Sequence, residues 1–311
     1  MLKFVISLLV GSLILSCKSY QETQSKPRKD QIRYEQFTAD QKFYRSKEGV
    51  IKYIDKGEGP VVVLLHGMPT SGWLFRKMMY TIIAGGNRVI IPDMLGFGNS
   101  DSPEGYEIYD EDHHAKRLLA LMEHLEIESW SQVVHDAGGL WTWELLKQAP
   151  DKINKLVLLN SVVFSKGFYP PMCYKPGNAA KSNMWALSTG IKTNKFLKDL
   201  FDNGLQQNDL NEIDLEGYRK PLLDKKTNGM YYYYTTTCAD LPDYTETFEK
   251  LNIPAIAIWG IHDTMTQWTP QQYSIIDAFK LKETDIFLMD EKHFLPEAKP
   301  REVAYKILDF L

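Results

Sequence analysis

Short apolar runs alternate along the chain with longer amphipathic segments. The apolar runs have the length of strands and are rich in Val, Ile and Leu, as is typical of strands buried on both faces. They lie at residues 61–65, 88–92, 132–134, 155–159, 255–259 and 285–289. The segments with a helical pattern lie around residues 73–84, 110–125, 139–149, 270–280 and 298–311. This order predicts an α/β fold, with a mostly parallel central sheet flanked by helices.

One interval is too long for an ordinary connection between neighbouring strands. It runs from Asn160, at the end of one predicted strand, to Ala255, at the start of the next, and contains helical patterns, aromatic residues and prolines. We interpret residues 165–245 as an inserted helical cap over the carboxyl edge of the sheet, where open parallel sheets bind ligands. The core would then consist of residues 41–164 and 246–311.

The first residues have the pattern of an export signal. Lys3 precedes an apolar stretch, residues 4–15, which is shorter than the about 20 residues that a helix needs to cross a bilayer. Residues 1–16 are therefore predicted to be a signal peptide. Because Ser16-Cys17 resembles a bacterial lipobox, cleavage would leave Cys17 as a lipid-modified N-terminus. The alternative is a plain secretory signal in which Cys17 is incidental.

These features predict a protein exported to the bacterial cell envelope. It would be anchored to the membrane through Cys17, or periplasmic or secreted if Cys17 is not lipidated. Residues 17–40 are mostly polar and lack periodicity, so we expect them to form a tether, with the fold starting near residue 40. Export would place Cys173 and Cys238 in an oxidising compartment. Two possibilities stay open for them, a disulfide and two free buried thiols.

Composition and charge restrict the class of protein. The chain has 311 residues, 44% of them hydrophobic, which is enough to bury one large core with an inserted module. Its formal net charge is −4, and its basic run at residues 26–29 is short. We therefore expect a small-molecule substrate and no nucleic-acid partner.

Residues 133–139 read VVHDAGG and combine the end of a strand, a sharp turn and the start of a helix. This is the pattern of a nucleophile elbow, whose tight geometry favours small neighbours such as Ala137 and Gly138. At the turn stands Asp136, where many hydrolases have a serine. A carboxylate with an unperturbed pKa of ~3.9 is already ionised at neutral pH and can attack saturated carbon without a base.

Two further motifs accompany the elbow. HGMP at residues 66–69 follows an earlier strand, and DMLGFGNS at residues 93–100 follows the next one. With these motifs in this order, the chain resembles the α/β-hydrolase family, and within it the epoxide hydrolase and haloalkane dehalogenase branch, whose nucleophile is aspartate. The resemblance runs from about residue 45 to the C-terminus and weakens in the cap. It implies an α/β-hydrolase fold and an ester formed on Asp136.

The resemblance also implies the other members of a catalytic triad. His293, after the last predicted strand, stands where the family carries the base that activates water. Asp263, just past the preceding strand, could orient the imidazole. Asp136, Asp263 and His293 occur in the hydrolase order of nucleophile, acid and base. The backbone N–H groups of Met68 and Ala137 are the candidates for an oxyanion hole.

The leaving group separates the two subfamilies. Dehalogenases bind the halide with side-chain N–H donors, and neither Ala137 nor Met68 supplies one. Epoxide hydrolases use tyrosines of the cap as donors. The run at residues 231–234 lies where the family places one such tyrosine, and spacing favours Tyr233, with Tyr232 as its neighbour. Trp185 could donate its indole N–H to either leaving group, or form an apolar wall.

The sequence therefore predicts an exported hydrolase that acts through an Asp nucleophile and an alkyl-enzyme ester, most similar to an epoxide hydrolase. The alternatives are a haloalkane dehalogenase and a surface-anchored binding protein that has lost turnover. We expect no cofactor. We expect no metal either, because no histidine pair is spaced with Cys or carboxylates as a metal site requires.

Overall fold

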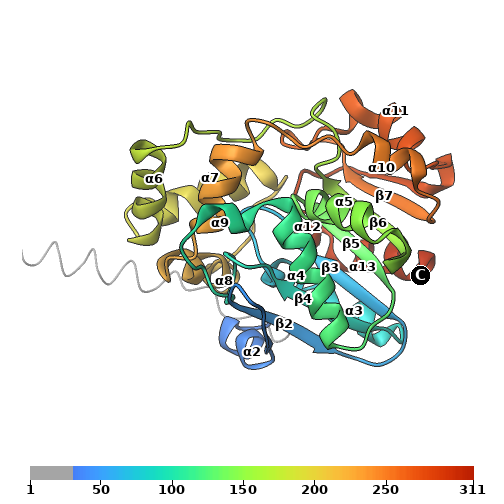
Figure 1. Ribbon diagram of the computed structural model, residues 1–311, viewed down its shortest axis with the longest axis horizontal. Helices are drawn as coiled ribbons and strands as arrows, with labels where there is room; N and C mark the ends of the chain where they lie inside the picture. Colours follow the sequence, from blue (N-terminus) through green and yellow to red (C-terminus); the bar gives the residue numbers. More distant parts are fainter. Residues whose placement is uncertain (1–30) are drawn as a thin grey trace, which may run out of the picture.

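The computed structural model describes residues 31–311, which fold around one eight-stranded sheet (Figure 1). The predicted signal peptide and Cys17 lie outside the described residues. The strands are β1 Lys42–Arg45, β2 Val50–Lys56, β3 Val61–Leu65, β4 Arg88–Asp93, β5 Trp130–Asp136, β6 Ile153–Ser161, β7 Ala255–Gly260 and β8 Ile286–Met289. Their order in the sheet is β1-β2-β4-β3-β5-β6-β7-β8. β1 and β2 are antiparallel to their neighbours, and the other pairs are parallel.

The central strands explain the apolar runs in the sequence. In β7 every residue is buried, and in β3 and β5 all but one are. Full burial means that both faces of the sheet are covered, so these strands cannot alternate between polar and apolar positions. The predicted mostly parallel α/β fold is confirmed. β1 and β2 lie at the edge, are less buried, and were not predicted.

Helices connect and cover the strands. In the core they are α3 Met79–Ala84, α4 Glu111–His124, α5 Gly138–Gln148, α10 Thr245–Lys250, α11 Trp268–Ala278, α12 Leu295–Ala298 and α13 Pro300–Phe310, with short helices at η1 Gly72–Phe75, η2 Tyr106–Tyr109, η3 Pro150–Lys152 and η5 Glu283–Asp285. α4 packs on α5, and α3 packs on α13. In this way the helices shield the apolar strands from solvent.

One boundary expected from the sequence is wrong. Residues 34–39, placed in the tether, form helix α2 (Tyr34–Ala39). Tyr34 and Phe37 are buried, and their rings lie edge-on to Trp73 at centroid distances of 5.5 and 5.3 Å. Two aromatic residues three positions apart lie on one helix face, so they bury together despite the polar residues around them.

The interval between β6 and β7 contains a group of helices that lies beside the sheet edge (Figure 1). They are α6 Asn178–Ser188, α7 Thr193–Gly204, α8 Glu212–Leu223, α9 Asn228–Tyr232 and the π-helical turn η4 Tyr233–Thr237. We call residues 165–245 the insertion. Among residues 31–311, no helix has the length and apolar character needed to cross a membrane.

A buried ion network fixes the insertion to the core. Arg76, at the end of η1, donates to Glu297 of α12 and, at 2.6 Å, to Asp214 of α8. Its guanidinium stacks on Trp73 at 4.3 Å, and the Trp73 indole donates to the Asp214 carbonyl at 2.9 Å. Tyr218 of α8 donates to Glu297 as well. Because Arg76 needs carboxylates from both parts of the chain, the network holds α8 against the core.

The insertion carries a disulfide between Cys173 and Cys238. Of the two possibilities left open by the sequence, the structure shows the pair. The bond joins the segment before α6 to the end of η4, and the Tyr174 N–H donates to the Tyr234 carbonyl at 2.7 Å beside it. The disulfide therefore ties two separate stretches of the insertion together.

We expect the double variant Cys173→Ser/Cys238→Ser to lose about 2–4 kcal/mol of unfolding free energy. The bond closes a loop with a sequence separation of 65 residues, and removing it enlarges the conformational freedom of the unfolded chain. Urea unfolding with and without a thiol reductant measures the loss. Reductant should destabilise the wild type and leave the double variant unchanged; equal unfolding curves for wild type and variant would contradict this role.

Candidate active site

The carboxyl ends of the parallel strands bring the predicted triad together. Asp136 ends β5, Asp263 follows β7 and His293 follows β8, and all three side chains are buried. His293 Nδ1 lies 2.8 Å from Asp263 Oδ2, and His293 Nε2 lies 3.5 Å from Asp136 Oδ2. The imidazole thus lies between the two carboxylates.

Asp136 lies at a strained turn. Its φ is +52°, a value that non-glycine residues seldom adopt. Its carbonyl accepts from the Val162 N–H and the Ser161 hydroxyl, both at 3.0 Å, which holds the backbone in place. A Cβ on Gly67 would lie 2.4 Å from the Asp136 Cβ, and one on Gly138 would lie 2.6 Å from the His66 carbonyl oxygen. Both glycines are needed for this close approach.

Backbone donors hold the Asp136 carboxylate. The Met68 N–H donates to Oδ1 at 2.6 Å, and the Ala137 N–H also hydrogen-bonds the carboxylate. The structure therefore brings both predicted oxyanion-hole groups to Asp136. Burial raises the pKa of Asp136 above its usual value, although His293 and these two N–H groups oppose the shift.

Asp263 is held as an anion. It accepts from the Asn160 amide and the Thr266 hydroxyl, each at 2.6 Å, and from the Met265 N–H at 2.7 Å. Burial alone would raise the pKa of Asp263, but His293 and these hydrogen bonds outweigh it and lower the pKa. The charge can then stabilise a protonated His293.

The environment of His293 suits a base. Burial alone would lower the pKa of His293, but Asp263 and Asp136 outweigh burial and raise it. If Nδ1 donates to Asp263, Nε2 is left as the acceptor, and this buried atom has no hydrogen-bond partner among residues 31–311. An unpaired acceptor beside Asp136 is available to a water molecule.

Several residues of the site were missed from the sequence. Asn160 donates to Asp263 and accepts from the Gly260 N–H at 2.9 Å, which links β6 to β7. His135 Nε2 lies 3.1 Å from the His293 carbonyl oxygen, so a donated hydrogen bond would fix the loop of the base. Both are polar side chains next to the last residue of an apolar strand, and this is the only signal that the sequence offers.

His66 shapes the loop that carries Met68. Its Nε2 accepts from the Met94 N–H at 3.0 Å, so the proton must lie on Nδ1, which donates to the Gly67 carbonyl at 2.9 Å. Burial lowers the pKa of His66 to about 4. The ring is therefore neutral near pH 7 and connects two loops of the carboxyl edge.

A small cavity of about 10 Å³ lies at Asp136. It is lined by Met68, Asp136, Phe168, Pro170, Pro171, Leu200, Tyr233, Tyr234 and Met265. The wall is mostly apolar, as expected for a site that excludes bulk water. At this volume the cavity holds about one water molecule beside the Asp136 carboxylate.

Two tyrosines face this cavity, and one of them was not singled out from the sequence. Tyr233 and Tyr234 are buried in η4, and burial, with the Asp136 charge second, raises the pKa of each phenol. Within residues 31–311 neither hydroxyl has a hydrogen-bond partner. Both phenols are protonated at neutral pH and free to donate to a substrate.

The other two candidates of the insertion do not line the cavity. Tyr232 is half-buried, and its pKa is raised to about 12 by burial and by Glu111 and Asp110, not by Asp136. Trp185 is 58% exposed on α6. The buried face of α6 contains Met184 and Leu187, so its neighbour Trp185 points outward. The prediction that Trp185 contacts a leaving group is corrected by this placement.

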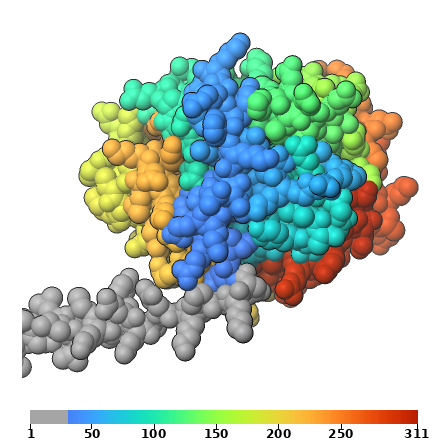
Figure 2. Space-filling model, turned by 90° about the horizontal axis from the view of Figure 1, so that it is seen from below, coloured from blue at the N-terminus to red at the C-terminus, as the bar shows by residue number. Residues whose placement is uncertain are grey.

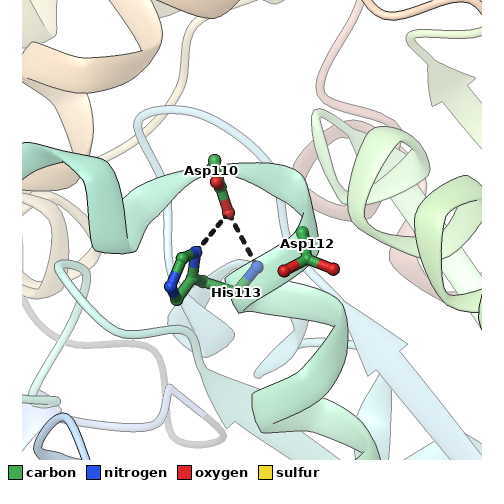
Figure 3. A group of neighbouring side chains, drawn as sticks. All are labelled: Asp110, Asp112 and His113. Carbon is green, nitrogen blue, oxygen red and sulfur yellow. Dashed lines mark hydrogen bonds and ion pairs between the residues drawn. The ribbon is translucent and has the colours of Figure 1, made fainter.

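The described residues contain one group with the spacing of metal ligands, Asp110, Asp112 and His113 at the start of α4 (Figure 3). The Asp110 carboxylate already has hydrogen-bond partners in this group. Its carboxylate accepts from the His113 backbone N–H at 2.7 Å and contacts the His113 ring at 2.7 Å. Asp110 is therefore the N-cap of α4.

Comparison with known proteins decides the family. The model of the alpha/beta hydrolase fold family matches residues 60–300. The chain belongs to this α/β-hydrolase family. Family and fold are thus as the sequence predicted, and the triad lies within the matched region of the hydrolase.

The relatives of this α/β hydrolase include a haloalkane dehalogenase of Mycolicibacterium paratuberculosis, 38% identical over 120 residues, which are 38% of this chain and 38% of that enzyme. The chain thus aligns with little more than a third of that relative. The uncharacterized hydrolase YugF of Bacillus subtilis is 25% identical over 85% of this chain and 95% of its own. The structure is similar to epoxide hydrolase VrEH1 of Vigna radiata, with a TM-score of 0.68 and 22% identity over 87% of this chain and 97% of that one.

Proposed function

We propose that this α/β hydrolase opens epoxides to diols through a covalent ester on Asp136. The observation that carries the proposal is the cavity in which the Asp136 carboxylate and two unpaired phenols, of Tyr233 and Tyr234, face one small space. The names of the epoxide hydrolase and haloalkane dehalogenase neighbours agree with chemistry at saturated carbon.

In the first half of the reaction, a carboxylate oxygen of Asp136 attacks one epoxide carbon and the C–O bond to the ring oxygen breaks. The ring oxygen gains negative charge and takes a proton from Tyr233 or Tyr234. Because burial raises the pKa of both phenols, each remains a hydrogen-bond donor until that charge develops. The product is a hydroxyalkyl ester on Asp136.

In the second half, water attacks the carboxyl carbon of the ester and His293 Nε2 accepts its proton. Asp263 stabilises the imidazolium at 2.8 Å. The oxyanion that forms at Asp136 accepts hydrogen bonds from the backbone N–H groups of Met68 and Ala137. The ester C–O bond then breaks, the departing alkoxide takes the proton from His293, and the diol leaves. The proton that remains on the Asp136 carboxyl group returns to the tyrosinate, which restores both the Asp136 carboxylate and the phenol.

The second candidate is haloalkane dehalogenase activity. The 38% identity to a protein of that name favours it. Against it, the positions that face the carboxylate, Met68 and Ala137, offer only their backbone N–H groups and no side-chain donor for a halide. A substrate panel of styrene-type epoxides, short haloalkanes and nitrophenyl esters, scored for diol, halide and phenolate, separates these activities from simple ester hydrolysis. A surface-anchored binding protein without turnover would release none of the three.

The variant Tyr233→Phe/Tyr234→Phe is expected to lower diol formation by about 10²–10⁴-fold, because the epoxide oxygen loses its proton donors. Tyr232→Phe is the matched control, since Tyr232 lies in the same run but does not line the cavity. Its rate should stay close to the wild type. Steady-state kinetics with an epoxide measures both variants, and an unchanged rate in the double variant would argue against phenol donation.

We further propose that residues 1–16 direct export and that Cys17 carries the lipid. The apolar stretch at residues 4–15 and the Ser16-Cys17 junction support the proposal. A fatty-acid analogue should label the wild type in a bacterial host and leave Cys17→Ser unlabelled. Equal labelling of the two chains would rule this anchor out.

A further inference from the structure

The first part of the insertion is strongly basic. Residues 165–198 contain six lysines and no Asp or Glu. Lys195 and Lys198 are paired with carboxylates of the next helical turn. Lys181 and Lys192 are exposed and have no carboxylate within 4 Å among the described residues. Positive charge is thus left unbalanced on α6 and on the turn that follows it.

Large apolar side chains are exposed at the same place. Trp185 on α6 is 58% exposed, and Ile191 in the turn between α6 and α7 is 68% exposed. Lys181 and Trp185 are four positions apart on one helix and therefore lie side by side on its surface. We call Lys181, Trp185, Ile191 and Lys192 the insertion tip. Exposed apolar residues with lysines around them are typical of a surface that binds a partner.

The insertion tip lies at the outer edge of the molecule. Figure 1 shows α6 at the end of the molecule opposite α10 and α11, and in Figure 2 the corresponding segment forms the edge of a lobe. Within residues 31–311, more than half of the surface of Trp185 and of Ile191 is left exposed. A flat partner could therefore approach this edge without meeting the rest of the domain.

The described chain begins next to the insertion. Gln31 and Asn211, the N-cap of α8, exchange hydrogen bonds of 2.8 and 3.2 Å, and α2 packs on α8. If Cys17 carries a lipid, as proposed above, the segment from Cys17 to Gln31 can span at most about 50 Å when fully extended. The insertion then stays near the membrane, and the tether raises the effective concentration of any weak docking contact.

We propose that the insertion tip docks on a bilayer surface that contains anionic lipids. Amphipathic rings such as that of Trp185 prefer the headgroup level of a bilayer. Each lysine near an anionic surface increases binding about fivefold. The basic groups of residues 165–198 are all lysines, whereas sites that recognise nucleic acid or phosphate groups bidentately favour arginine. These features together favour a lipid surface over a polyanion.

Docking would also place the cavity wall near the lipid. Phe168, Pro170 and Pro171 line the cavity and belong to the same basic stretch of chain. Tyr169, between them, is 52% exposed. Apolar substrates partition into bilayers, so a cavity wall held at the bilayer surface would meet them at raised concentration.

The test uses the chain from residue 17 onward with Cys17→Ser in every variant, so that neither the signal peptide nor a lipid contributes. Co-sedimentation compares vesicles of phosphatidylcholine with vesicles that also contain phosphatidylglycerol. The parent chain should bind the anionic vesicles, and Lys181→Gln/Lys192→Gln should lower the partition coefficient by about 25-fold, since each lysine is worth about fivefold. Trp185→Ser/Ile191→Ser should weaken binding as well.

The matched control is Arg301→Gln/Tyr305→Ser on α13, which changes one exposed cation and one aromatic residue that is 59% exposed. It should bind like the parent. Thermal unfolding checks that all four chains are folded. The proposal is overturned if the parent does not bind anionic vesicles, or if the tip variants bind as well as the parent. It is also overturned if the tip is needed for binding RNA or an acidic polypeptide but not vesicles. None of these chains carries a lipid, so the result tests docking by the insertion tip and does not depend on whether Cys17 is lipidated.

Discussion

His293→Gln is expected to stop the reaction after its first half and leave a covalent ester on Asp136. In the proposed mechanism Asp136 attacks as a carboxylate and needs no base, whereas the water of the second half must lose a proton to His293 Nε2. Loss of a positioned base slows such a step by roughly 10²–10⁴-fold. Intact-protein mass spectrometry after incubation with an epoxide should therefore show the added mass of the substrate.

A milder variant and an opposing mechanism sharpen this experiment. Asp263→Asn should accumulate less ester than His293→Gln, because an amide at Asp263 favours the wrong imidazole tautomer without removing the base. If His293 instead activated the nucleophile, as in serine hydrolases, His293→Gln would show no adduct. Incubation with a haloalkane in parallel identifies the leaving group, since only a substrate that Asp136 attacks produces the mass shift.

Mildly acidic pH should slow the second half of the reaction, ester hydrolysis, more than the first half, ester formation. The carboxylates of Asp263 and Asp136 raise the pKa of His293 above its usual ~6.5. His293 is a base only when neutral, so ester hydrolysis is lost as the pH falls through this raised pKa. In the proposed mechanism, attack by the Asp136 carboxylate does not require a neutral His293. The wild type should therefore accumulate some ester in mildly acidic buffer, which rapid-quench mass spectrometry detects.

Asp136→Ala is expected to abolish turnover, with a rate loss on the order of 10⁶-fold as in other enzymes that lose their nucleophile. It should also trap no adduct, even in combination with His293→Gln. Asp112→Ala, which removes a half-buried carboxylate on α4 that does not line the cavity, is the control and should retain wild-type activity. Residual turnover close to the wild-type rate would mean that water attacks the substrate directly.

Heavy-oxygen water distinguishes the two routes in the wild type. If the proposed ester forms, the oxygen that joins the substrate in a single turnover comes from the Asp136 carboxylate, so the first diol should be unlabelled. The label should instead appear in the carboxylate, where water attacked the ester. A labelled first product would show direct hydrolysis and contradict the ester mechanism.

The sequence predicts the central sheet well because those strands are buried on both faces. β3, predicted at 61–65, has the same bounds in the structure. β1 and β2 were missed because they lie at the sheet edge and mix charged with apolar residues, for example in VIKYIDK of β2. α2 was missed for a related reason: Tyr34 and Phe37 are its only buried residues, so its apolar pattern is weak.

The sequence predicts which side chains meet at the sheet edge where position along the chain decides it. Asp136 ends a strand, Asp263 and His293 follow strands, and the carboxyl ends of parallel strands meet at one edge of the sheet. Within the insertion no such rule holds. The face that a helix buries depends on its packing, so Trp185 could not be distinguished from its buried neighbour Met184. For the same reason the sequence could not show that Cys173 and Cys238 are close enough to pair.

The ion network around Arg76 limits how this domain can be recombined with its relatives. A chimaera that takes residues 165–245 from another α/β hydrolase would lose Asp214 and Tyr218 and keep Arg76 and Glu297 in the core. A buried guanidinium that loses one of its carboxylates costs roughly 3–5 kcal/mol, a large part of the stability of an average domain. Exchange of the insertion would thus require a compensating change at Arg76 itself. Substrate range is therefore more readily altered at single wall residues such as Leu200 and Met265 than by grafting the whole module.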